Sequence, residues 1–410
     1  MALELTTIGN RLRAARANCN KTQDEAAKAL GIGRTAIIAI ENGDRPPTLE
    51  ELHAFARLYG RPVAEFLDEK PEDVLVALLR ATPELLDGDQ AQREIMRHVA
   101  ICRAGADLER LMGTNVRRAP PAYDLPAPTS VVEALDQGDI VARQERQRLG
   151  IGDNPISDMA DLLTSTGIWA SGSQLPGEMS GLFLRHPSIG MVVLVNYNHG
   201  RARKRFSYAH EFGHALLDRS DTATVSTQRN RTELREVRAN AFAAAFLLPA
   251  AGVRRFLAGR GKGVHSRMET VVYDPGLESQ DEPVRATHRP SPGSQKVGYQ
   301  DVSALAHAFG TSYQAAAYRI KTLGIISERE LADCLEKKDL GWKYLKILGL
   351  YEDIEGEDKQ RPDRELVTQV VDLAMEAFRR DQITADRLIE LGTTLGLGGR
   401  KLAELAEATV

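Results

Sequence analysis

The pattern His-Glu-x-x-His at residues 210–214 constrains the fold of this chain more than any other feature. Four residues make just over one helical turn, so a helix projects His210 and His214 from one face, where both imidazoles can bind one metal ion. Glu211 lies about 100° around that helix, within reach of a water molecule activated at the metal. The pattern therefore predicts a metal-binding helix with Glu211 as its catalytic acid/base.

A catalytic zinc ion normally takes a third ligand from the protein. We expect Glu236 to provide it, because this residue follows His214 by 22 positions and lies in a second predicted helix, 233–248. Asn240, one helical turn further, is predicted to accept the remaining N–H of a ligand imidazole. Glu233 is the competing candidate for the third ligand. Zn²⁺ is the expected ion, and Mn²⁺ suits the same ligands.

Each of these segments also has a simpler explanation. Two histidines on one helix face can be ordinary core or surface residues, and the alanine-rich segment after Glu236 can be a helix of the core. Two strands are predicted before the histidine helix, at 181–184 and 191–195, separated by a turn at His186 and Pro187. The order of strands, histidine helix and glutamate helix favours a metal site over these simpler explanations.

Composition and cysteine content indicate a multidomain protein of the cytoplasm. A chain of 410 residues with 42% hydrophobic and 27% charged residues is long enough for two to four globular domains. It contains no run of about 18 apolar residues and no signal-peptide pattern at its start, so we expect no membrane partner. The three cysteines, Cys19, Cys102 and Cys334, are far apart. This spacing argues against a disulfide framework and against a thiolate zinc site.

Residues 6–68 predict five short helices. Helix-capping boxes, in which a threonine precedes a glutamate by three positions, occur at Thr22 and at Thr48. The helices are expected at 8–17, 23–30 and 34–41, from Thr48, and from Pro62. Because residues 1–68 contain nine basic and nine acidic residues, this module has no broad electrostatic attraction to nucleic acid, and any DNA binding must be local.

The remainder of the chain is predicted as mainly helical around one small sheet. Helices are expected at 71–112, 131–150, 159–166, within 301–324 and in much of the tail. A Pro-rich stiff linker covers 119–128, and the composition of 259–298 indicates a flexible insertion. The expected units are a helical N-terminal module (1–68), a connector and linker (69–129), a metal-binding core (130–258), the insertion (259–298), a helical unit completing the core (299–328) and a helical C-terminal region (329–410).

Two segments around the metal-binding pattern resemble the ImmA/IrrE family of metallopeptidases. The resemblance covers about 130–325 and depends on residues 205–214 and 236–249. It implies a central α+β domain of the gluzincin type, with His210, His214 and Glu236 as zinc ligands and Glu211 as acid/base. Members of this family characteristically cleave helix-turn-helix repressors in the bacterial cytosol. Many have a second glutamate where this chain has Arg238.

The N-terminal helices resemble the XRE helix-turn-helix family. The matching residues are Thr22, Gln23, Ala26, Ala27, Leu30 and Gly31, followed by Ile37, Ile40, Glu41, Asn42 and Gly43. The resemblance implies that DNA binds through residues 1–68 and that the chain forms a homodimer. It places Gln23, Arg34 and Thr35 in the major groove, with Asn42 and Arg45 near phosphates. The alternative is a module that binds another protein.

These observations predict a cytosolic zinc endopeptidase fused to a DNA-binding module. Its substrate is expected to be a regulatory protein, a repressor or an antitoxin-like regulator, whose cleavage controls stress, mobile-element or defence genes. One alternative is a transcriptional regulator whose metal domain senses a signal or binds a partner without turnover. A third hypothesis is that the helix-turn-helix only recruits the substrate.

Overall fold

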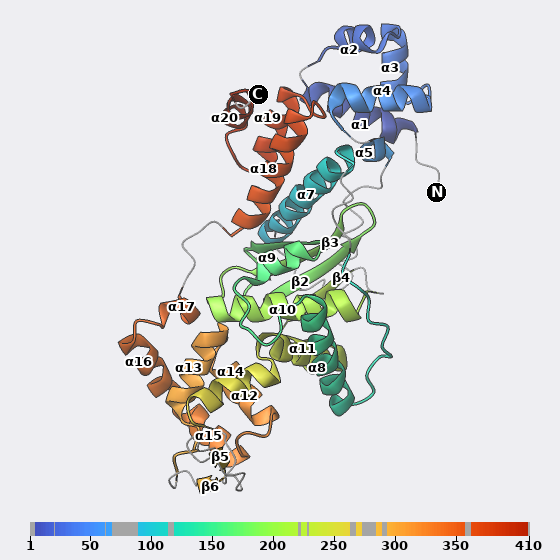
Figure 1. Cartoon of the computed structure of the whole chain (residues 1–410). Coiled ribbons are helices and arrows are strands. Elements are labelled where there is room, and N and C mark those ends of the chain that lie inside the picture. The colour runs from blue at the N-terminus through green and yellow to red at the C-terminus, as the bar shows by residue number, and fades with distance from the viewer. Residues whose placement is uncertain are drawn as a thin grey trace, which may run out of the picture.

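The computed structural model describes residues 5–19, 21–61, 63–67, 89–113, 119–219, 223–227, 229–262, 268–272, 284–288, 293–356 and 362–408. The chain is mainly helical and arranges its elements around a small central sheet (Figure 1). Within the described residues no single helix is long and apolar enough to cross a bilayer. The helices Leu234–Leu247 and Ala250–Gly259, bent by 43°, reach that length and composition only as a pair.

Five helices form the N-terminal module, as predicted. They are α1 (Leu5–Asn18), α2 (Gln23–Leu30), α3 (Arg34–Asn42), α4 (Leu49–Tyr59) and α5 (Val63–Leu67). Both capping boxes are present, with Thr22 accepting from the Glu25 N–H and Thr48 from the Glu51 N–H. The apolar faces of these helices enclose a core of their own around Leu12, Ile37, Phe55 and Tyr59. The sequence pattern was therefore sufficient to locate this unit.

The central sheet has four strands in the order β1-β3-β2-β4. The strands are β1 (Ile168–Ser173), β2 (Met179–His186), β3 (Gly190–Asn196) and β4 (Ala223–Thr227). β3 pairs in parallel with β1 and antiparallel with β2, and β4 pairs antiparallel with β2. The predicted strands at 181–184 and 191–195 correspond to β2 and β3. β1 and β4 were not predicted, because both are short and include serine, threonine or glycine at buried positions.

Helices cover both faces of the sheet, which explains the continuous apolar run of β3. One face packs on α8 (Val131–Arg148), α9 (Met159–Ser165), α10 (Arg201–Leu217) and α11 (Leu234–Leu247). The other packs on α7 (Asp89–Leu111), α18 (Arg364–Arg379), α19 (Ala385–Thr394) and α20 (Gly399–Glu407). Along β3, Val193 and Val195 face the first group of helices, whereas Val192 and Leu194 face the second.

The predicted C-terminal region 329–410 is divided between two cores. α15 (Glu328–Glu336), α16 (Lys338–Ile347) and α17 (Glu352–Glu355) join α12 (Ala250–Gly259), α13 (Tyr299–Phe309) and α14 (Tyr313–Thr322) in a third core. The later helices α18–α20 return to the sheet and pack beside α7. A boundary at residue 329 therefore does not coincide with a change of core, because long-range packing rather than sequence order joins these helices.

The structure adds detail to two other predicted segments. Within the predicted insertion 259–298, β5 (Met268–Val272) and β6 (Val284–His288) form a two-stranded antiparallel sheet. The Pro-rich linker is held against the core, because the Tyr123 N–H donates to the Leu216 carbonyl at 3.0 Å and Arg219 donates to the Pro120 carbonyl. The part of the predicted helix 71–112 before residue 89 lies outside the described residues.

Candidate metal centre

Two helices bring the predicted metal ligands together. α10 carries His210 and His214 beneath the sheet, and α11 crosses it with Glu236 in its first turn. Aromatic side chains fix this crossing, because the ring of Phe212 packs edge-on against Phe242 at 5.8 Å between centroids. The fixed crossing determines where Glu236 meets the two imidazoles.

The donor atoms of His210, His214 and Glu236 all lie within 4.8 Å of one another. The Nε2 atoms of the two histidines are 3.1 Å apart, and the Glu236 carboxylate lies 3.1 Å from His210 Nε2 and 3.5 Å from His214 Nε2. All three residues are buried. The competing candidate Glu233 lies outside this cluster, and its half-exposed carboxylate pairs with Arg235 at 3.1 Å.

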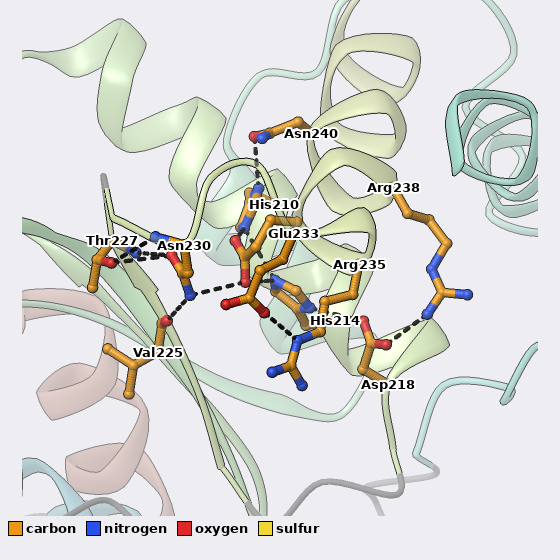
Figure 2. A network of polar contacts seen from close by, with 11 residues as sticks. His210, His214, Asp218, Val225, Thr227, Asn230, Glu233, Arg235, Arg238 and Asn240 are labelled. Atoms are coloured by element: carbon orange, nitrogen blue, oxygen red, sulfur yellow. Dashed lines mark hydrogen bonds and ion pairs between the residues drawn. The ribbon is translucent and has the colours of Figure 1, made fainter. Parts of the chain in front are cut away.

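The outer ring nitrogens determine which atoms face the centre of the cluster. His210 Nδ1 lies 3.0 Å from Asn240 Oδ1, and His214 Nδ1 lies 2.8 Å from Asp218 Oδ2 (Figure 2). Both partners are acceptors, so each Nδ1 carries the hydrogen in a neutral ring and each Nε2 presents a lone pair. Two lone pairs and a carboxylate thus converge on one point. Such an arrangement repels itself unless a cation occupies that point, so these residues fit a divalent metal ion.

The pKa values of His214 and Glu236 also indicate that this cluster stabilises a positive charge. Burial opposes the charged form of His214, but hydrogen bonds to Asp218 and Glu236 outweigh burial and raise its pKa to about 10. Burial would also raise the pKa of Glu236, but the bonds from both imidazoles outweigh it and lower this pKa to about 2. The carboxylates therefore hold positive charge at this place strongly, as a proton or as a metal ion.

Asp218 and Arg238 extend the site beyond the residues predicted from the sequence. Arg238 is buried and donates to Asp218 at 2.6 Å and to Gln137 Oε1 at 2.9 Å. Asp218 in turn holds His214, so the arginine fixes a carboxylate that orients one imidazole (Figure 2). The contact between Asp218 and His214 could have been predicted, because residues four positions apart lie on the same face of a helix. The contact between Asp218 and Arg238 could not, because it joins two separate segments of the chain.

A second polar group supports Glu236. The side-chain amide of Asn230 donates to the Glu236 carboxylate at 3.4 Å and to the Val225 carbonyl at 2.9 Å. The carbonyl oxygen of the same amide accepts from the N–H and hydroxyl of Thr227 at 3.0 Å. Asn230 thus connects the edge strand β4 to Glu236 (Figure 2). The sequence analysis did not identify it.

Glu211 lies against strand β2, where a Cβ atom built at Gly181 would be 2.8 Å from its Oε1. Its side chain is completely buried, and neither oxygen accepts a well-formed hydrogen bond within the described residues, although the Ser226 hydroxyl is near enough to favour the charged form. Burial raises the pKa of Glu211, and the adjacent histidines oppose that rise. A carboxylate with a raised pKa next to a metal centre is suited to accept a proton from water.

A cleft of about 250 Å³ opens onto this cluster. Ser180, Thr227 and Arg231 line it together with Phe206 and Asn240, and both His210 and Glu236 reach its wall. The three-residue cluster therefore borders a cleft, even though its side chains are buried.

The residues expected to contact DNA fall into two groups. Arg34 and Thr35 are exposed at the start of α3, and Arg34 makes only a 3.6 Å pair with Asp24. The other three have partners inside the module, because Gln23 donates to the buried Glu41 at 2.9 Å, Asn42 accepts from Arg13 at 2.5 Å and Arg45 pairs with Glu51 at 2.5 Å. Of these five residues, Arg34 and Thr35 can therefore turn toward a ligand at the loss of no more than the long Arg34–Asp24 ion pair.

Comparisons with known proteins match two separate parts of the chain, the N-terminal module and the domain that contains the His-His-Glu cluster. Residues 164–272 match the family model of the IrrE N-terminal-like domain, and residues 12–66 match a helix-turn-helix model. The cryptic phage CTXphi transcriptional repressor RstR of Vibrio cholerae is 29% identical over 67 residues, covering 16% of this chain and 60% of the repressor. An uncharacterized helix-turn-helix transcriptional regulator of Methanocaldococcus jannaschii is 39% identical over 64 residues, covering 15% of this chain and 97% of that protein. No solved structure matches the chain.

Proposed function

This chain belongs to the XRE-type helix-turn-helix family and joins that module to an IrrE-like peptidase domain, and we therefore propose that it is a zinc-dependent endopeptidase that cleaves a regulatory protein. One observation carries the proposal. Two imidazole lone pairs and the Glu236 carboxylate converge beside a buried glutamate whose pKa is raised. Ordinary core packing offers no reason to place three acceptors against one another.

The chemistry follows from the positions of these groups. When bound by His210, His214 and Glu236, zinc supplies Lewis-acid activation of water and of a peptide carbonyl. Glu211 accepts a proton from the attacking water at its carboxylate oxygen and transfers it to the nitrogen of the leaving amine. Asn240 and Asp218 hold the two imidazoles in the tautomer that leaves Nε2 free. Mn²⁺ would suit the same ligands, so metal content identifies the ion.

We propose that the helix-turn-helix module directs the peptidase to its substrate on DNA. The exposed start of α3 supports DNA contact through Arg34 and Thr35. A peptidase bound to an operator is at high effective concentration relative to regulators bound nearby, which favours a repressor or antitoxin-like protein as substrate. Its cleavage would release stress, mobile-element or defence genes, and the module would pair as a homodimer in the cytoplasm.

The test combines metal content with cleavage. Mass spectrometry should find one zinc ion in the wild type and in Glu211→Gln, but not in His210→Ala, because only the last change removes a ligand. Purified helix-turn-helix repressors encoded beside the gene should be cut by the wild type alone. Bound metal with every repressor left intact would favour a metal-dependent sensor without turnover. Absence of metal from the wild type would refute the metal centre itself.

A further inference from the structure

Residues of α8, α11 and α14 line an apolar groove of about 730 Å³. Figure 1 shows these three helices close together on the side of the sheet that carries α10. Leu135 and Ile140 of α8 and Tyr318 of α14 line the groove, and their side chains are 42%, 43% and 53% exposed. Three large apolar side chains gathered around one hollow form a surface that water solvates poorly, and such surfaces mark binding sites.

Small side chains leave the groove open between these larger ones. Ala241 and Ala244 of α11 and Ala315 of α14 line the hollow, and all three are partly exposed. An alanine at each position leaves room for a bulky side chain of a bound molecule. The groove therefore fits aliphatic or aromatic side chains inserted between the helices.

The groove and the cleft at the metal centre share part of their lining. Phe206 and Asn240 line both, and Asn240 is the residue whose side chain holds His210 at 3.0 Å. A chain that crosses Asn240 would therefore have one part in the apolar groove and the next part at the metal centre.

A buried arginine holds the groove in shape. Arg319, which is only 5% exposed, donates to the Leu248 carbonyl at 2.9 Å and pairs with Asp139 of α8 at 2.9 Å. Asp139 also pairs with Arg143 at 3.2 Å, so the charged side chains at the edge of the groove have partners among themselves. α14 is thus fixed to α8 and to the end of α11, and a groove formed in advance costs little ordering on binding.

We propose that this groove binds a segment of the protein substrate rich in bulky apolar side chains, directly next to the scissile peptide bond. The inference rests on the proposed peptidase function and adds the chemistry of the substrate. Apolar segments are buried in folded proteins. The groove therefore favours a substrate that exposes such a segment or unfolds locally to offer it.

The test uses a mixture of short peptides of random sequence, incubated with the zinc-loaded full chain and analysed by mass spectrometry. We expect Leu, Ile, Phe and Met to be enriched at a fixed distance on one side of the cleaved bond. Leu135→Ser, which removes one wall, and Ala244→Trp, which fills the hollow, should each raise KM about tenfold, equivalent to one buried side chain, and reduce the enrichment. Leu340→Ser is the matched control, because Leu340 is 44% exposed on α16, outside the groove.

A binding measurement separates failure of this inference from failure of the peptidase proposal. The same peptides are passed over immobilised Glu211→Gln protein, which should keep its metal but not cleave. Retention of apolar peptides that is lost in both groove variants, with unchanged metal content, would support the groove even if no peptide is cut. Cleavage or retention without apolar enrichment, or with enrichment unchanged in both groove variants, would overturn the inference.

Discussion

Gly181 shows how closely the fold encloses Glu211. A Cβ atom at this position of β2 would lie 2.8 Å from Glu211 Oε1 and 3.0 Å from its Cγ. The absence of a side chain on the strand therefore provides the space in which the buried carboxylate lies. This requirement belongs to one residue on a neighbouring element, and the pattern at 210–214 carries no sign of it.

Gly181→Ala should therefore displace Glu211 while leaving the three metal ligands in place. We expect metal content to be unchanged, kcat to fall by about tenfold or more, and unfolding stability to fall by about 1–3 kcal/mol from overpacking. Gly177→Ala is the control, because no atom lies within 4 Å of its added Cβ. Zinc analysis, peptide cleavage and thermal unfolding of both variants would check this. Equal activity in the two variants would show that Glu211 does not need its present position.

At the scale of elements, the pairing of α8 with α11 positions the third ligand. A Cβ atom at Gly138 of α8 would lie 2.5 Å from the Arg238 carbonyl and 2.7 Å from the Phe242 nitrogen. The two helices therefore pack backbone to backbone. This contact lies next to Glu236 and Asn240 on α11, so a helix that ends 86 residues before α11 begins helps to position both side chains.

The α3 helix carries the prediction for DNA binding. Ile37 and Ile40 bury one face of this helix in the module, which leaves Arg34 and Thr35 at its exposed start. Replacing both with alanine should weaken DNA binding about tenfold or more, and loss of a charged contact should reduce its salt dependence. Arg57→Ala, an exposed position on α4, serves as the control. Titration of operator DNA at two salt concentrations is the measurement, and equal affinity in all three proteins would contradict α3 as the reading helix.

At the scale of the whole molecule, the C-terminal helices hold the DNA-binding module against the body. Arg61 donates to Glu390 of α19 at 2.5 Å and also pairs with Glu65, and Arg387 donates to Glu390 at 2.6 Å. Asn18 of α1 reaches the same carboxylate at 2.6 Å. Figure 1 places α2 and α3 on the side of the module away from this contact, so docking leaves α3 uncovered by the C-terminal helices.

Glu390→Gln should loosen this contact. The change leaves Arg61, which is 7% exposed, with only part of its negative partner, and we expect docking to weaken by about 2 kcal/mol. Hydrogen exchange in α1 and α5 should then quicken about 30-fold, while exchange in α10 stays the same. Asp24→Asn, which removes an exposed pair, is the control. Unchanged exchange in α1 and α5 would mean that the ion pairs do not hold the module.

The same contact should depend on pH. Burial would raise the pKa of Glu390, but Arg387 and Arg61 outweigh burial and lower it below its usual value. The folded state therefore binds this proton less readily than the unfolded state, so the contact is fully stabilising above the ordinary glutamate range and is lost as pH falls through the lowered value. Hydrogen exchange in Glu390→Gln should lack this acid-dependent step.

Much of the architecture was predictable from local patterns. Capping boxes, glycines at helix ends and apolar spacing are properties of neighbouring residues, and they located the N-terminal helices and those of 299–324. β1 and β4 escaped prediction, because their buried serines and threonines are tolerated only where neighbouring strands and helices cover them. The return of α18–α20 to the sheet escaped prediction too, because no local feature specifies a contact over more than two hundred residues.

The sequence by itself determined the chemistry that this protein offers: two imidazoles one helical turn apart, a carboxylate between them, and a second helix with Glu236 and Asn240. The spacing along a helix fixes those relations whatever the surroundings. Only the tertiary structure decided that Glu236 rather than Glu233 joins the histidines, that Asp218 and Arg238 orient one of them, and that Gly181 makes room for Glu211. Those choices depend on the angle at which separate elements cross, and that angle is set by packing among residues distant in the chain.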